Sequence, residues 1–139
     1  MIFKRLFILA AFAFVHISFA KGYWIPIYTQ PDNSDTFLMD NQGIRIENFG
    51  SGTRLVYVDV LVNKFQPYMN NGQAVNSMTT TYSYNCFNRM ILVGDVVMRS
   101  GSNGSGSQVA VHRSSGEWRE VRSPGPTPAI VSRIQNYCN

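Results

Sequence analysis

The sequence has 139 residues, enough for one domain with a single modest hydrophobic core. Hydrophobic residues make up 45% of it and charged residues 14%, with a formal net charge of +4. Because the basic residues are scattered and the net charge is small, the composition argues against a nucleic-acid-binding protein and against one held on an anionic membrane.

The start of the chain has the three parts of a secretory signal peptide. Lys4 and Arg5 give a positive start, an apolar stretch follows, and Ser18 and Ala20 give the small-x-small end that precedes a cleavage site. A retained transmembrane anchor is the alternative, but the apolar stretch is short for a membrane span. We therefore predict a signal peptide that ends at Ala20, followed by one exported domain over residues 21–139 without an integral membrane span.

Cleavage changes both the charge and the expected location. Loss of Lys4 and Arg5 from the 12 basic residues leaves 10 against 8 acidic ones, a net charge of +2. No cysteine directly follows Ala20, so we expect no lipid anchor. The sequence predicts a domain in the periplasm, at the cell surface or outside the cell.

Export also gives a meaning to the two cysteines, Cys86 and Cys138. In an oxidising compartment, two cysteines in a small domain usually form a disulfide. If the bond is intramolecular, it joins Cys86 to Cys138; two free thiols and an intermolecular bridge are the alternatives. The chain-entropy estimate for closing a loop of about 50 residues is ~4 kcal/mol of stability.

Most of the exported chain has the pattern of β-strands separated by turn residues. Pro26 indicates that the first strand is an edge or irregular strand, because proline cannot donate to a sheet ladder. We expect loops at residues 66–73 and 101–108, the second of them flexible. The expected strands cover residues 23–29, 36–40, 44–49, 53–65, 74–86, 89–100 and 109–113.

Residues 53–65 form the strongest strand pattern. Its two faces are Val56, Val58, Val60 and Val62 on one side and Leu55, Tyr57, Asp59 and Leu61 on the other. A strand that is apolar on both faces is expected at the centre of a sheet. Asp59 then needs a partner if it is buried.

Residues 74–86 alternate as clearly as the preceding strand. The side expected to face the core carries Met78, Thr80, Tyr82, Tyr84 and Cys86. Because residues 89–100 follow after a short connection, we expect an antiparallel hairpin, with a bulge at Gly94.

The pattern changes to a helical period near the C-terminus. Thr127 is expected to cap this helix, and Pro128 suits its first position. An apolar stripe then follows, made of Ile130, Val131, Ile134, Tyr137 and Cys138. Because so short a helix is unstable alone, we expect it to pack on the sheet face that carries Cys86. The predicted fold is α+β, an antiparallel sheet with one C-terminal helix.

No pattern indicates a catalytic, cofactor-binding or metal-binding residue. His112 is the one histidine that remains after export, and no G-x-S-x-G motif accompanies it. A small hydrolase with His112 as its base is the enzymatic alternative, for which we find no substrate. The glycine-rich stretch 101–107 lacks the Gly-Lys-Ser/Thr ending of a phosphate-binding loop.

The acidic residues are dispersed and show no spacing typical of a catalytic pair. Residues 32–35 resemble a calcium-binding loop only loosely, and we interpret them as a turn. The acidic residues of the chain are Asp32, Asp35, Asp40, Glu47, Asp59, Asp95, Glu117 and Glu120.

Aromatic residues in edge or loop segments are the remaining signal. Such residues are enriched at protein interfaces, although we favour the interpretation that the tryptophans cover a thin core. These residues are Tyr23, Trp24, Tyr28, Tyr68 and Trp118.

Several segments in order resemble the surface-adhesin E family of bacterial exported proteins. They are "FLMD" with "GIRI", then "LVYVDVLVNKF", "YSYNCFNRM" and finally "EWREVRSPGPTPAIVSRIQNYC". The resemblance implies a sheet of about six strands with a C-terminal helix tied to it by Cys86–Cys138. It also implies surface exposure and adhesion to host matrix or serum proteins, with laminin, vitronectin and plasminogen as candidates.

Two non-enzymatic functions follow from this resemblance. The first is an adhesin-like binding module that uses an exposed sheet face or loops such as 66–73 and 101–107. The second is a periplasmic structural or accessory protein of the cell envelope, with a homodimer through a sheet edge as one form. We expect no cofactor and no nucleic-acid partner in either case.

Overall fold

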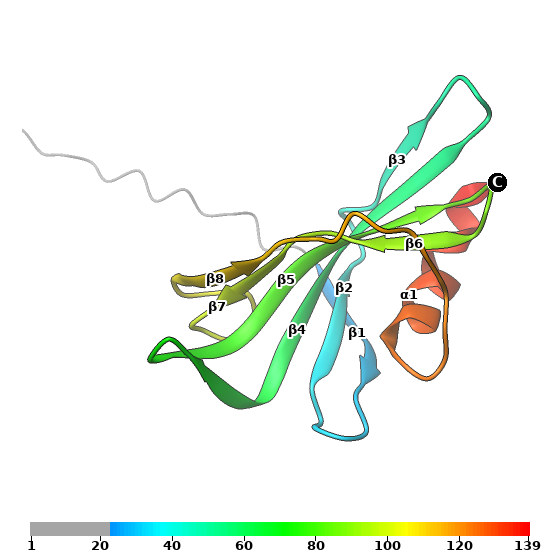
Figure 1. Cartoon of the computed structure of the whole chain (residues 1–139). Helices are drawn as coiled ribbons and strands as arrows, with labels where there is room; N and C mark the ends of the chain where they lie inside the picture. Colours follow the sequence, from blue (N-terminus) through cyan, green and yellow to red (C-terminus); the bar gives the residue numbers. More distant parts are fainter. Residues whose placement is uncertain (1–22) are drawn as a thin grey trace, which may run out of the picture.

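The computed structural model describes residues 23–139, so the predicted signal peptide over residues 1–20 lies outside the described part. Residues 23–139 form one antiparallel sheet and one C-terminal helix (Figure 1). The strands are β1 (Trp24–Thr29), β2 (Thr36–Asp40), β3 (Arg45–Asn48), β4 (Arg54–Asn70), β5 (Gln73–Asn85), β6 (Met90–Val93), β7 (Val96–Arg99), β8 (Gln108–His112) and β9 (Arg119–Glu120).

The sheet is organised around β4 and β5, which have 17 and 13 residues. They pair from Leu55↔Asn85 to Asn70↔Gln73, with one irregularity in β4 between Asn63 and Tyr68. Each long strand has two further neighbours. β3 and β2 pair with successive parts of β4, while β7 and β6 pair with successive parts of β5.

In the described part of the chain the sheet has nine strands, more than the six or so that the family resemblance implied, and its main path runs β1-β2-β4-β5-β6-β9. Three further strands pair beside this path: β3 on β4, β7 on β5, and β8 on β7. The strand β1 is an edge strand with an irregularity between Pro26 and Tyr28, as the proline predicted. The antiparallel α+β fold is therefore confirmed.

The loop predicted over residues 66–73 is wrong, because β4 and β5 continue through it. Tyr68 pairs with Val75, and the chain turns only at Asn71 and Gly72. Both turn residues have positive φ, 48° and 80°, which gives a turn whose twist matches that of a hairpin. Pro67 and the irregularity before Tyr68 hide the strand pattern in the sequence.

The strand predicted over residues 89–100 is divided in two. β6 and β7 both pair antiparallel with β5, so the predicted hairpin is confirmed. Gly94 lies in the break, and its N–H donates to the carbonyl of Thr81 at 2.8 Å. A Cβ at Gly94 would lie 3.0 Å from that carbonyl oxygen, a contact tight enough that any other residue would require the backbone to shift slightly.

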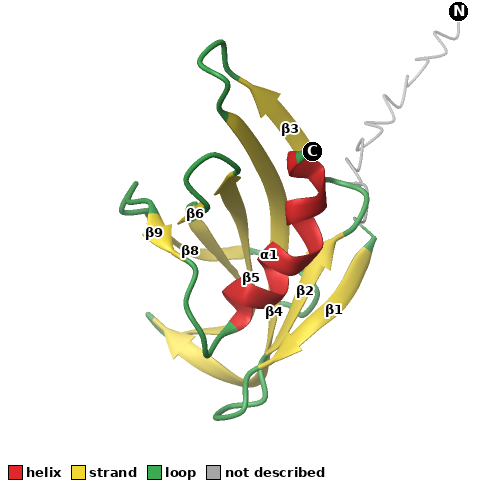
Figure 2. Ribbon diagram, turned by 90° about the vertical axis from the view of Figure 1, so that its right-hand side faces the viewer, coloured by secondary structure: helices red, strands yellow, loops and turns green. Residues whose placement is uncertain are grey.

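The C-terminal helix α1 (Pro126–Ile134) continues as a short 3₁₀ helix, η1 (Gln135–Cys138). Its N-cap is Gly125 and Pro126 is in the first turn, so the predicted cap at Thr127 is two residues too late. No side chain caps this end. Figure 2 shows the helix across one face of the sheet, with β1 and β2 to one side and β6 and β9 to the other.

The hydrophobic core lies between this helix and the sheet. Ile130 and Ile134 are fully buried, whereas Tyr137 is 38% exposed. Tyr137 leaves the predicted stripe because a 3₁₀ helix has three residues per turn, which rotates the last side chains away from the α-helical face. The buried cluster consists of Met39, Val56, Val58, Val60, Tyr82, Tyr84, Ile91, Ile130, Val131 and Ile134.

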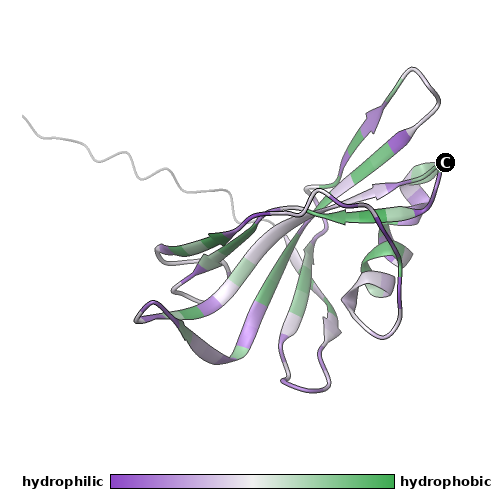
Figure 3. Cartoon of the chain, in the orientation of Figure 1, coloured by the Kyte–Doolittle hydropathy of each residue, from purple (hydrophilic) through white to green (hydrophobic). Residues whose placement is uncertain are grey.

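The hydropathy of β4 follows this arrangement, with hydrophobic residues predominating in its middle and polar residues among them (Figure 3). Of the four valines predicted to share a face, Val56, Val58 and Val60 are completely buried, and Val62 is half-buried. Within residues 23–139, no helix is both long and apolar enough to cross a membrane.

The predicted disulfide is confirmed. Cys86 and Cys138 are bonded, with their Cα atoms 5.5 Å apart. The bond joins the end of β5 to the end of η1, and both cysteines pack against the buried cluster. It therefore holds the last turn of the chain on the sheet.

We predict that Cys86→Ser/Cys138→Ser lowers the free energy of unfolding by ~4 kcal/mol. The bond has a sequence separation of 52 residues, and its loss restores that loop entropy to the unfolded chain. Urea denaturation of the two proteins measures the difference. A reductant should destabilise the unmodified protein and leave the double variant unchanged; equal stability of the two proteins without reductant contradicts the prediction.

Candidate functional site

The sheet has a second face, on the side away from α1, and part of it is covered by residues 101–107. The Gly104 N–H donates to Ser77 Oγ at 3.0 Å, and the Asn103 N–H donates to Asn63 Oδ1 at 2.8 Å. Leu61 and Ser77 are fully buried beneath. The segment expected to be a flexible loop is therefore fastened to the sheet by hydrogen bonds.

A charged network occupies the neighbouring part of this second face. Arg45 donates from Nη1 to Asp59 Oδ2 and from Nη2 to Asp59 Oδ1, both at 3.2 Å. Thr81 Oγ1 also donates to Asp59 Oδ1, at 2.6 Å. The expectation that Asp59 needs a partner is confirmed, because β3 and β5 each supply one to this strand.

The network keeps Asp59 ionised. Partial burial would by itself raise the pKa of Asp59, but the hydrogen bonds from Arg45 and Thr81 and the charge of Arg45 outweigh it and hold that pKa below its ordinary value. The hydrogen bond to Asp59 in turn raises the pKa of Arg45. The pair remains an oriented carboxylate and guanidinium over the whole neutral range.

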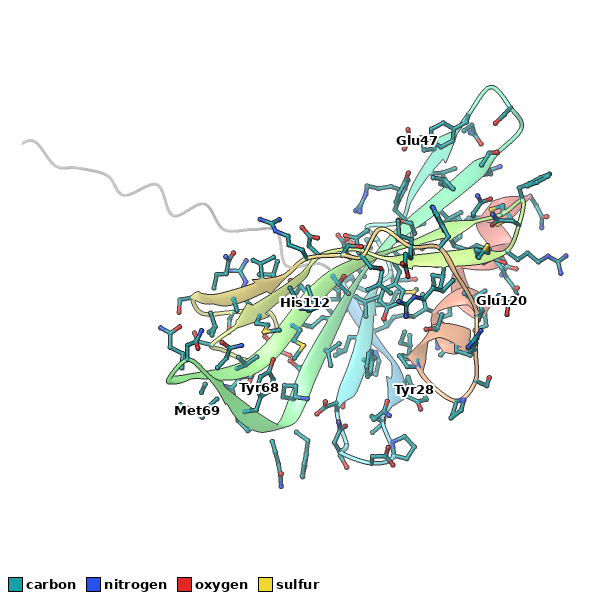
Figure 4. The ribbon with its side chains drawn as sticks, viewed as in Figure 1. Tyr28, Glu47, Tyr68, Met69, His112 and Glu120 are labelled. Carbon is teal, nitrogen blue, oxygen red and sulfur yellow. A yellow bond between two sulfur atoms is a disulfide. The ribbon has the colours of Figure 1, made fainter. Side chains whose placement is uncertain are left out.

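Beside it, Tyr57 Oη donates to Glu47 Oε2 at 2.9 Å. Burial and this hydrogen bond raise the pKa of Tyr57. The hydroxyl therefore remains a donor at neutral pH. Glu47 lies on the β3 hairpin that projects from the sheet (Figure 4).

A hollow of about 320 Å³ opens next to Asp59 on this face. Asp95 lies on it from the β6–β7 break, where its carboxylate accepts from Arg113 Nη1 at 2.8 Å and from the Ser114 N–H at 2.7 Å. These bonds hold the pKa of Asp95 below its ordinary value. The hollow is lined by Trp24, Asp59, Thr79, Thr80, Thr81, Asp95 and Val97.

This hollow was not predicted from the sequence. Trp24, Asp59 and Asp95 come from three distant segments, and only the sheet topology brings them together. Asp59 alone could have indicated a site, because it is a charged residue within an otherwise apolar stretch of strand. No sequence pattern associates Trp24 or Asp95 with Asp59.

His112 lies at the end of β8, exposed, on a different groove. That groove has a volume of about 470 Å³ and lies between β6 and residues 112–122. Glu120 also lines it, and Figure 4 shows the labelled His112 and Glu120 well apart. Within residues 23–139, no hydrogen bond joins His112 to a serine or a carboxylate, so the geometry does not support the hydrolase alternative.

In the turn over residues 32–35, the carboxylate of Asp35 is bound by other residues of the protein and is not available to a cation. Asn33 Oδ1 accepts from the Asp35 N–H at 3.0 Å. The buried Asp35 carboxylate forms an ion pair with Lys64 and accepts from the Phe65 N–H at 3.1 Å. Across the described part of the chain, no group of three or more His, Cys, Asp or Glu residues is arranged to hold a metal ion.

The aromatic residues predicted at edges divide into two kinds. Tyr23 is 59% exposed, whereas Trp24, Tyr28, Tyr68 and Trp118 are half-buried. Tyr28 packs edge-on against Phe37, with ring centroids 5.9 Å apart, and Tyr68 Oη donates to Met98 Sδ at 3.1 Å. Tyr28 and Tyr68 therefore contribute to packing within the domain.

Two apolar side chains at or next to the predicted loop 66–73 are more exposed than these aromatic residues. Phe65 and Met69 are 68% and 65% exposed near the end of the β4–β5 hairpin. Figure 4 shows Tyr68 and Met69 at this end of the molecule, far from the β3 hairpin. We call residues 65–73 the hairpin tip.

A family model described as surface-adhesin protein E matches residues 24–138, almost all of the described chain. The chain belongs to the surface-adhesin protein E family. The resemblance inferred from the sequence is thereby confirmed. No curated protein matches the sequence. Proteins of an adhesin family are typically binding proteins and not enzymes.

We predict that Asp59→Asn lowers the free energy of unfolding by at most about 1 kcal/mol at neutral pH, because the pair with Arg45 is only half-buried. Since the pKa of Asp59 is lowered in the folded protein, its stabilisation is present above about pH 4 and is lost as the pH falls further. The difference between variant and unmodified protein should therefore shrink at acid pH.

Urea denaturation at neutral pH and below about pH 3 checks this prediction. Asp32→Asn, in the exposed turn, is the control and should change stability little at either pH. A difference for Asp59→Asn that grows on acidification contradicts the prediction.

Proposed function

We propose that the protein is an exported, non-enzymatic binding module that attaches bacteria to host extracellular-matrix or serum proteins. The family match over residues 24–138 carries this proposal. Laminin, vitronectin and plasminogen are the candidate partners. The predicted signal peptide supports export, which a location at the cell surface requires.

The hairpin tip is the surface that we assign to this contact. Phe65 and Met69 expose apolar surface there, and exposed apolar groups and methionine are typical of protein interfaces. The base of the tip is held by the Asp35 bonds to Lys64 and Phe65 and by the Tyr68–Met98 contact. The two apolar side chains thus extend from a well-supported hairpin, which lowers the entropy cost of binding.

We predict that protease added to intact cells removes the protein. A surface adhesin is accessible to the protease, whereas a periplasmic accessory protein is protected and is released by osmotic shock. An antibody to residues 21–139 measures the loss, and a known periplasmic protein controls for lysis. Protection of the protein in cells that remain intact favours the periplasmic alternative over adhesion.

We further predict that Phe65→Ser/Met69→Ser weakens binding to immobilised laminin or vitronectin at least about tenfold, which corresponds to about 1.4 kcal/mol. Both residues are exposed, so the fold should be unaffected. Phe87→Ser is the matched control, since Phe87 is 82% exposed in the β5–β6 turn at the other end of β5. Unchanged affinity of the double variant, for a partner that the unmodified protein binds, excludes the tip as the contact surface.

A further inference from the structure

We propose that the hollow beside Asp59 binds one unit of a neutral saccharide. It lies on the sheet face away from α1 and is formed by β1, β4, β5 and the β6–β7 break. The proposal concerns a small-molecule site and does not depend on the hairpin tip or on adhesion.

The first argument is the chemistry of the lining. A pyranose has a face of C–H groups and a rim of hydroxyls, so it needs a flat apolar surface and several hydrogen-bonding groups. Trp24 supplies an aromatic ring that is half-buried and open to the hollow. Asp59, Asp95 and the threonines supply acceptors and hydroxyls around it.

The second argument is the charge balance. Each carboxylate on the hollow has its own arginine partner, Arg45 for Asp59 and Arg113 for Asp95. The carboxylates therefore contribute no uncompensated negative charge that would select a cation, and among residues 23–139 no basic residue lines the hollow to hold an anion. A neutral ligand that donates hydrogen bonds through hydroxyls fits this balance best.

The third argument is preorganisation. Arg45 and Thr81 fix the orientation of the Asp59 carboxylate, while Arg113 and the Ser114 N–H fix that of Asp95. A carboxylate oxygen accepts more than one hydrogen bond, so both groups retain capacity for ligand hydroxyls. Thr79 makes no side-chain hydrogen bond to any residue within 23–139, which leaves its hydroxyl free for a ligand.

The size of the hollow limits the ligand. Its volume of about 320 Å³ is near the lower end of the range of roughly 300–1,000 Å³ for small-molecule sites. This suits a single sugar unit, free or at the end of a longer glycan. Host glycoproteins and the bacterial cell wall both contain such units.

The test uses tryptophan fluorescence of the exported protein. Because the chain has two tryptophans, Trp118→Phe leaves Trp24 as the single reporter, and Trp24→Phe leaves Trp118, which does not line the hollow. Each variant is titrated with glucose, galactose, mannose and N-acetylglucosamine at millimolar concentrations. We expect at least one sugar to change the Trp24 signal saturably and to leave the Trp118 signal unchanged.

Asp95→Asn tests the polar contacts, with Asp32→Asn as its control, both in the Trp118→Phe background. Loss of a charge-assisted hydrogen bond should weaken sugar binding about tenfold for Asp95→Asn and leave it unchanged for Asp32→Asn. Circular dichroism verifies that each variant is folded. The proposal is overturned if no sugar changes the Trp24 signal, or if both tryptophans respond alike.

The identity of the bound sugar distinguishes the two sources. Preference for galactose- or mannose-terminated glycans indicates a host glycoprotein, and preference for N-acetylglucosamine oligomers indicates the cell wall. Either preference supports the site. Since free sugars are used, failure here leaves the adhesion proposal standing, and loss of laminin or vitronectin binding leaves the saccharide proposal standing.

Discussion

The pairing of β4 with β5 along their full length is the interaction on which the rest of the structure depends. Every other strand pairs with one of these two strands or with a strand that does. The hairpin closes through a two-residue turn, so its contacts are local in sequence and cost little loop entropy. The other strands and α1 can then add to a surface that already exists.

Successive side chains of β4 point to opposite faces of the sheet, so residues of the core and residues of the second face alternate along the strand. Val56, Val58 and Val60 face the helix and are completely buried, so this side of the strand stabilises the fold. The opposite side carries Tyr57 and Asp59, whose partners come from β3 and β5. A substitution at Tyr57 or Asp59 therefore leaves the core under α1 largely unchanged, whereas Leu61 on the same side is fully buried and contributes to stability.

The features of the fold that depend on local sequence patterns were predicted correctly. The central strands, the helical stripe of Ile130 and Ile134 and the Cys86–Cys138 bond follow from periodicity and from cysteine number, and all are present. The prediction from sequence failed where a local signal conflicts with strand pairing. Pro67 interrupts the strand pattern of β4, but β4 continues beyond it because residues 68–70 pair with β5. The prediction also could not place Trp24 beside Asp95, because no local pattern encodes which distant strands meet.

Because α1 follows every described strand of the sheet in chain order, its position has a consequence for biogenesis. A polypeptide that enters a compartment from its N-terminus delivers the sheet first and residues 126–138 last. Until the helix arrives, the valine face of β4 is open to water and to other unfinished chains. Efficient production of the protein thus depends on rapid delivery of residues 126–138 after the sheet, and a chaperone that shields the sheet in this interval should raise the yield.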